Sequence, residues 1–162
     1  MSTQNAAPER AVSRPEHIAV GCLTDAQSYF HSATVLDAME DGLVHIAPIY
    51  FLLCHTIELL LKAYLLSNGV DARELQKSHI RHQLKELGKA SQDKGLNLSE
   101  HSIAIIDMLA PHHENHSFRY RKTGFKSFPL PSEIRKAIAE VLQTVGPVVV
   151  NNLRAQLANS TA

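Results

Sequence analysis

Apolar residues recur at spacings of three and four along most of the chain, a pattern typical of amphipathic helices. The first such stretch predicts a helix over residues 15–40, with Pro15 in its first turn. Its apolar positions are Leu23, Ala26, Phe30, Ala33 and Leu36. Residues 47–67 are apolar on nearly all sides, so this second segment is expected to be the central, buried helix, ending at Asn68-Gly69.

Three more helices follow from cap residues and apolar stripes. Ser78 is a candidate cap for a helix that runs to about residue 94. Ser99 is a candidate cap for a fourth helix, which we expect Pro111 to end or kink, with a long loop over residues 112–131. A fifth helix opens at residues 132–133, and Gly146-Pro147 is expected to kink or split it before residues 148–158.

These five segments predict an all-α fold, an antiparallel up-and-down bundle of about five helices. Residues 1–13 are polar, aperiodic and rich in Ala, Ser and Pro, which indicates a disordered leader. Residues 14–162 are then expected to form a single helical-bundle domain, since 162 residues are one domain's worth of sequence.

Composition favours a cytoplasmic protein. The two cysteines, Cys22 and Cys54, are too few for a disulfide framework, and the amino terminus lacks the apolar core of a signal peptide. The most apolar segment is interrupted by His55, Glu58 and Lys62, so a buried helix is expected rather than a membrane span.

The chain has 16 basic and 16 acidic side chains, and a net charge of zero excludes binding of nucleic acid or anionic membrane through bulk charge. The charges are segregated, however. Residues 1–60 hold two basic and seven acidic side chains, whereas residues 61–126 hold eleven basic and seven acidic ones. An anionic ligand is therefore expected to bind in the middle of the chain.

Three groups of residues could carry chemistry, and the first is His55, Glu58 and Lys62 on the central helix. Spacings of three and four place them on one stripe, with Glu58 and Lys62 in the favourable order for a helical ion pair. Such a polar seam is either a thin solvent-facing strip or one wall of a pocket or subunit interface, because a buried charge persists only when it is paired.

The second group is the run from His112 to His116. On a continuing helix His112 and His116 would share a face, and imidazoles are common metal ligands. Closed zinc sites need four ligands, and paired Glu-x-x-His elements are missing. We therefore expect no metal and no cofactor, with His112 and His116 as the pair to consider if a metal binds.

The third group is a basic stretch interleaved with aromatic residues. It comprises Arg119, Tyr120, Arg121, Lys122 and Lys126, and the aromatic residues Phe118, Phe125 and Phe128 lie before, within and after this run. Guanidinium groups fit phosphate oxygens and aromatic rings stack on bases, so this composition suits a nucleotide or single-stranded RNA. An ordinary loop that packs its aromatic rings and solvates its charges has the same composition.

Three separated pieces resemble the HEPN domain superfamily. Residues 55–66 resemble its His-x-x-Glu helix, residues 82–87 its following His-x-Leu-x-x-Leu element, and Arg119-Tyr120 the Arg-Tyr that closes its third segment. The resemblance covers about residues 15–158. It implies a helical bundle, commonly a homodimer, linked to nucleotide binding, RNA cleavage, and nucleotidyltransferase partners in toxin–antitoxin or phage-defence systems.

The resemblance implies ligand contacts at specific positions. It places them at Glu58, Lys62, His82, Arg119 and Tyr120, and the polar seam and the basic stretch add His55, Arg121 and Lys122 as expected ligand contacts. Ribonuclease members carry an Arg and a His separated by four to six residues near the last-but-one helix junction. Here that spacing occurs only at Arg10 with His17 and Arg73 with His79, away from that place.

A binding module is therefore the first expectation, and an enzyme the less favoured one. If the protein is an enzyme, we expect a metal-independent endoribonuclease with His82, His116 and Arg119 as catalytic candidates. A third hypothesis is a non-catalytic bundle that binds a partner protein.

Overall fold

The all-round apolar segment forms the central helix of the protein. The computed structural model describes residues 15–39, 46–120 and 127–160. Within these ranges the chain has five α-helices, one short 3-10 helix and no strand, so the predicted all-α class is confirmed. The predicted leader, residues 1–13, lies outside the described residues.

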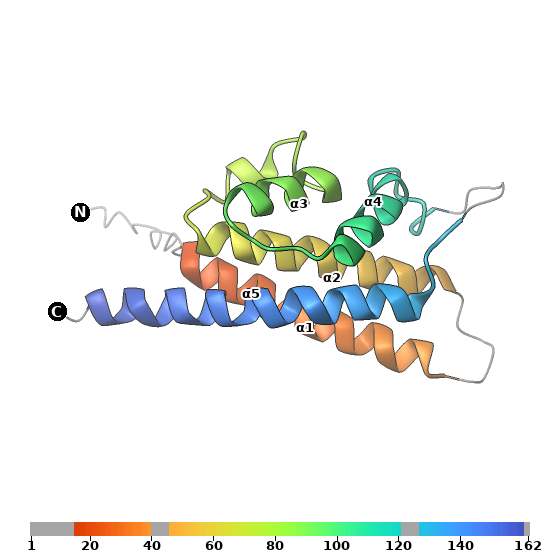
Figure 1. Ribbon diagram of the computed structural model, residues 1–162, viewed down its shortest axis with the longest axis horizontal. Coiled ribbons are helices and arrows are strands. Elements are labelled where there is room, and N and C mark those ends of the chain that lie inside the picture. Colours follow the sequence, from red (N-terminus) through yellow and green to blue (C-terminus); the bar gives the residue numbers. More distant parts are fainter. Residues whose placement is uncertain (1–14, 40–45, 121–126, 161–162) are drawn as a thin grey trace, which may run out of the picture.

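Helix α2 lies between two pairs of helices (Figure 1). It contacts α1 and α5 on one side and α3 and α4 on the other, and within each pair the two helices also contact each other. The elements are α1 (Pro15–Asp37), α2 (Ile46–Ser67), η1 (Glu74–Gln76), α3 (Leu84–Asp93), α4 (Glu100–Glu114) and α5 (Pro131–Ser160). A helix enclosed in this way needs apolar residues all round, which explains the pattern of α2.

Small residues allow α1 to pack closely on α2. Ala19, Ala26 and Ala33 are fully buried and recur every seven residues, so they form one stripe along α1. On the side of α5, Ile134, Ile138 and Val145 are buried in the same core. The predicted first helix is confirmed, although it ends at Asp37.

The predicted end of the central helix at Asn68-Gly69 is also confirmed. Gly69 has φ +82°, and the amides of Gly69 and Val70 donate to the carbonyls of Leu66 and Leu65. This is the glycine-terminated Schellman arrangement, which satisfies carbonyls that the helix leaves free. Helix α3 ends in the same way at Gly95, with φ +94°.

The predicted start of the third helix at Ser78 is wrong. Helix α3 begins at Leu84, and the preceding residues form turns. Two tertiary contacts favour turns over a helix in this segment. Ile80 is buried in the core, and His82 contacts Glu58 on α2. The capping preference of a serine is weak compared with these contacts.

The fourth helix begins as predicted but continues past its proline. The Ser99 side chain accepts a hydrogen bond from the amide of Ser102, which confirms the predicted cap. Pro111 does not end the helix, which continues to Glu114 and carries His112 and His113 in its last turn. A proline this close to the end removes only one hydrogen bond of the helix.

Helix α5 is not split at Gly146-Pro147. It is assigned as one helix of 30 residues with Pro147 inside it, and Val145 and Val149 on either side are buried. Packing of these valines keeps the two halves together across the hydrogen bond that proline cannot make. Beyond the other helices, the C-terminal part of α5 projects from the bundle (Figure 1).

Helix α2 is long and apolar enough to cross a membrane by length and composition. However, 72% of its most apolar window is buried inside the protein, as in the core helix of a soluble domain. This burial indicates a core helix, and the predicted cytoplasmic location stays a prediction.

Candidate functional site

A carboxylate is buried in the most apolar helix of the protein. Glu58 lies near the middle of α2, between Ile57 and Leu59 in the sequence, with only 1% of its surface exposed. An isolated charge in such a place would cost several kcal/mol, so its surroundings must compensate it.

Four side chains surround this carboxylate, and we call the five residues together the Glu58 cluster. Lys62 Nζ donates to Oε1 at 2.6 Å, and His82 Nδ1 lies 3.1 Å from the same oxygen. His113 Nε2 lies 2.6 Å from Oε2, and His55 Nδ1 lies 3.8 Å from it. The partners come from α2, from the turn before α3 and from α4, so the cluster joins three parts of the fold.

These partners keep Glu58 ionised. Burial alone would raise the pKa of this carboxyl, but the hydrogen bonds from His113 and Lys62, with the His55 ring nearby, outweigh it. The pKa of Glu58 is therefore held far below its ordinary value. Because an ionised carboxylate only accepts hydrogen bonds, the bound nitrogens of His82 and His113 carry protons that they donate to it.

The surroundings of His82 favour its neutral form. Burial lowers the pKa of His82, and this outweighs the Glu58 carboxylate, which alone would raise it. A neutral imidazole with its proton on Nδ1 has a free lone pair on Nε2. The ring is one-third exposed, so this lone pair belongs to a side chain that solvent and ligands can reach.

A cleft of about 300 Å³ opens beside this histidine. We call it the histidine cleft, and it is lined by Gln76, Ser78, Arg81, His82, Gln83, Glu114 and His116. The amide of Gln83 is placed to donate to the Glu114 carboxylate at 3.0 Å, and burial raises the pKa of Glu114. The turn before α3 and the end of α4 thus form the two walls of one opening.

His116 reaches this cleft through an unusual backbone conformation. Its φ of 54° is the only positive value at a residue other than glycine in the described part of the chain. The amides of His116 and Ser117 donate to the carbonyls of His113 and His112, the same helix ending that uses glycine after α2 and α3. A histidine pays a steric penalty in this conformation that glycine avoids, and such penalties concentrate at functional sites.

The two cleft histidines lie near each other. The ring centroids of His82 and His116 are 6.5 Å apart, and those of His116 and Tyr120 are also 6.5 Å apart. Tyr120 is 65% exposed, a large fraction for an aromatic side chain. The catalytic candidates His82 and His116 therefore come together, with an exposed ring beside them.

Arg119 lies on a different group of rings. Its guanidinium is 5.1 Å from the Phe51 ring centre, and Phe51 stacks on His55 at 5.9 Å. Tyr29 also contacts His55 in an edge-to-face arrangement, with ring centres 4.8 Å apart. Two of the predicted ligand residues, His55 and Arg119, thus connect through Phe51, while Arg121 and Lys122 lie outside the described residues.

Two aromatic residues of the basic stretch have a packing role. Phe118 and Phe128 pack on each other and on Tyr50, whose hydroxyl donates to the carbonyl of Pro129 at 2.7 Å. His112 packs against both phenylalanines. These contacts fix the chain that follows α4 and leave Tyr120 as the described aromatic ring of this stretch that is available for stacking.

The pair His112 and His116 is not a shared ligand set. His112 belongs to the phenylalanine group and His116 to the histidine cleft. Among the described residues, one group of metal-ligand side chains meets at close range, and it comprises Glu58, His82 and His113, with ligand atoms within 4.8 Å of one another.

His113 is the residue of the site that the sequence prediction missed. Only 5% of it is exposed, and it makes the shortest histidine contact to Glu58. A signal was present, because His113 continues the buried stripe of Ile106, Leu109 and Ala110 at helical spacing. If Pro111 ended the helix, this buried stripe would stop at Ala110, so the expected helix end excluded His113 from it.

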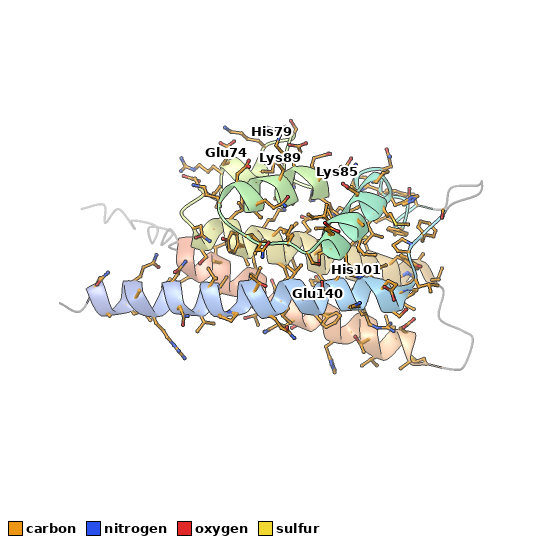
Figure 2. The ribbon with its side chains drawn as sticks, viewed as in Figure 1. Glu74, His79, Lys85, Lys89, His101 and Glu140 are labelled. Carbon is orange, nitrogen blue, oxygen red and sulfur yellow. The ribbon has the colours of Figure 1, made fainter. Side chains whose placement is uncertain are left out.

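Other polar side chains form smaller groups elsewhere on the molecule (Figure 2). His79 and Glu74 lie together on the turn before α3, at a distance of 3.8 Å. Glu140 of α5 accepts hydrogen bonds from Ser99 and Ser102 of α4. These groups connect neighbouring elements at the surface.

Comparisons of the chain with the models of known protein families, with curated proteins and with solved structures found no match.

Proposed function

We propose that the protein is a HEPN-like helical module, an antiparallel up-and-down bundle acting as a dimer in the cytoplasm, that binds a nucleotide or RNA in the histidine cleft. The proposal keeps the expected association with a nucleotidyltransferase partner. The observation that carries it is the meeting of Arg81, His82 and His116 on one opening.

Each of these side chains suits a phosphate-bearing ligand. Arg81 is exposed and supplies a fixed fork of donors for phosphate oxygens. His82 is held in one orientation by the buried Glu58 carboxylate, so it pays little ordering cost when a ligand binds. Glu114, the acidic group of the cleft, faces the amide of Gln83.

Tyr120 extends the site from the phosphate to the base. Its ring lies beside His116 and is mostly exposed, and stacking of a base on an aromatic ring contributes about 1–3 kcal/mol. A nucleotide with its phosphate in the histidine cleft and its base near Tyr120 would use both features.

Arg81→Ala tests the binding site. We expect it to weaken the affinity for a short single-stranded RNA by about 10-fold, because it removes charged hydrogen bonds to phosphate. The slope of log affinity against log salt concentration should fall by about one. Fluorescence anisotropy with labelled RNA and with labelled nucleotides at several salt concentrations measures both quantities.

Arg154→Ala is the matched control, because Arg154 is an exposed arginine on the projecting part of α5. Equal affinities of the Arg81 and Arg154 variants for RNA and for every nucleotide would contradict binding in the histidine cleft.

A second candidate function, RNA cleavage, is favoured by the 6.5 Å separation of the His82 and His116 rings. Two imidazoles near one phosphate can act as base and acid in attack by the 2′-hydroxyl. Neutral His82 would accept the proton of the 2′-hydroxyl through Nε2, and protonated His116 would donate to the leaving 5′-oxygen. Arg81, rather than the predicted Arg119, lies where it can stabilise charge on the phosphorane.

Cleavage is tested with RNA in the presence of EDTA. We expect products that end in 2′,3′-cyclic phosphate, and a loss of rate of at least about 100-fold in His82→Ala and in His116→Gly. Glycine suits the left-handed conformation of residue 116, so the second change removes the ring without straining the backbone. RNA with a 2′-deoxy residue at the cleaved position is the control. Cleavage that persists in the His116 variant would exclude this mechanism.

A further inference from the structure

We propose that Glu58, His82 and His113 form a binding site for a divalent transition-metal ion of the zinc class. The proposal goes beyond the binding of a nucleotide or RNA, and it is tested with the metal alone. It rests on the convergence of three ligand atoms from three separate elements at one buried point.

The donor set matches this class of ion. Two imidazole nitrogens and one carboxylate oxygen are ligands that Zn²⁺ and its neighbours among the transition metals prefer, whereas Mg²⁺ and Ca²⁺ prefer oxygen alone. The three atoms lie within 4.8 Å of one another, and tetrahedral zinc with bonds of about 2.0–2.1 Å needs them somewhat closer. The imidazoles would therefore move inward around the ion, and the ring proton that each now shares with Glu58 would be carried on its other nitrogen, because a metal-bound imidazole is neutral.

The surroundings resemble those of metal sites with an open position. Glu58 and His113 are almost fully buried, which fixes their positions, while His82 is one-third exposed and lines the histidine cleft. Three protein ligands leave a fourth position, and this position would face the cleft through which an ion enters.

Lys62 is the group that opposes metal binding. Its ammonium lies 2.6 Å from Glu58 Oε1, where it competes for the carboxylate and repels a cation. His55 lies beside the other oxygen at 3.8 Å, outside the proposed ligand set. Replacing Lys62 therefore distinguishes the two cases. Removing this cation should weaken a hydrogen-bonded network, but it should strengthen the binding of a metal ion.

The test uses purified full-length protein treated with chelator and titrated with Zn²⁺ against a coloured indicator, and with Co²⁺ by visible absorption. We expect one Zn²⁺ per chain and intense absorption bands typical of four-coordinate Co²⁺. His82→Ala should weaken the affinity for Zn²⁺ by about 100-fold or more, because removing even an outer partner of a metal ligand costs 10–100-fold. Lys62→Met should tighten it.

His79→Ala and His101→Ala are the controls, because these histidines, labelled in Figure 2, pair with Glu74 and Glu133 and not with Glu58. Both should bind Zn²⁺ like the parent. His113→Gln should lose binding, and circular dichroism establishes whether it is folded. If His113→Gln is not folded, the Zn²⁺ affinities of His82→Ala and Lys62→Met decide the outcome.

Two results would overturn the proposal. The first is the absence of stoichiometric Zn²⁺ binding, and the second is an affinity that His82→Ala leaves unchanged. Either would show that the three side chains form a hydrogen-bonded network only. Because no nucleotide or RNA is present, neither result bears on ligand binding in the histidine cleft.

Discussion

Glu58→Gln is expected to destabilise the folded protein by about 3–5 kcal/mol, the range for breaking a buried ion pair by removing one partner. Glutamine has nearly the same shape, but it carries no charge to offset the Lys62 ammonium, and its amide group places donors where the imidazoles also donate. A loss of this size is a large part of the 5–15 kcal/mol by which a domain is typically stable. Urea denaturation followed by circular dichroism at neutral pH measures it.

Glu74→Gln is the control for this prediction. Glu74 is also paired with a lysine, at 2.5 Å from Lys77, but both side chains are exposed. Pairs of this kind contribute about 0–1 kcal/mol because solvent screens them. If the two variants lost similar amounts of stability, the buried cluster would have no special role in the fold.

Local sequence rules predicted the architecture well where packing and backbone preference agree. The all-round apolar pattern of α2, the serine cap of α4 and the glycine after α2 each depend on neighbouring residues, and each was confirmed. The start of α3 could not be predicted this way. It depends on Ile80 entering the core and on His82 meeting Glu58, which is 24 residues away.

The candidate site could be predicted only in part for the same reason. Helical spacing identified Glu58 and Lys62 as a pair, and the pair exists. Helical spacing could not identify His113 as the histidine of α4 that completes the cluster. The position of His113 depends on how far α4 continues past Pro111. Arg81 had no signal beyond its charge, since a turn brings it to the cleft.

The contribution of Glu58 to stability should also appear in the pH dependence of the free energy of unfolding. Because the pKa of Glu58 is lowered in the folded state, its contribution is fully present above its ordinary pKa of 4.5 and is lost as the pH falls below that value. One proton taken up on unfolding changes the free energy of unfolding by about 1.4 kcal/mol per pH unit. Over two pH units the effect approaches that of the substitution itself.

The measurement is the free energy of unfolding from urea titrations between pH 2 and pH 7, for the parent and for Glu58→Gln. Other carboxyl groups also titrate in this range, so the informative quantity is the difference between the two curves. We expect this difference to shrink below pH 4.5, since the unfolded parent takes up a proton at residue 58 that the variant cannot take up. A difference that stayed constant down to pH 2 would mean that the pKa of Glu58 is the same in the folded and unfolded states, so that its charge contributes nothing to stability. Any loss of stability of Glu58→Gln at neutral pH would then come from the amide donors of the glutamine and not from the missing charge.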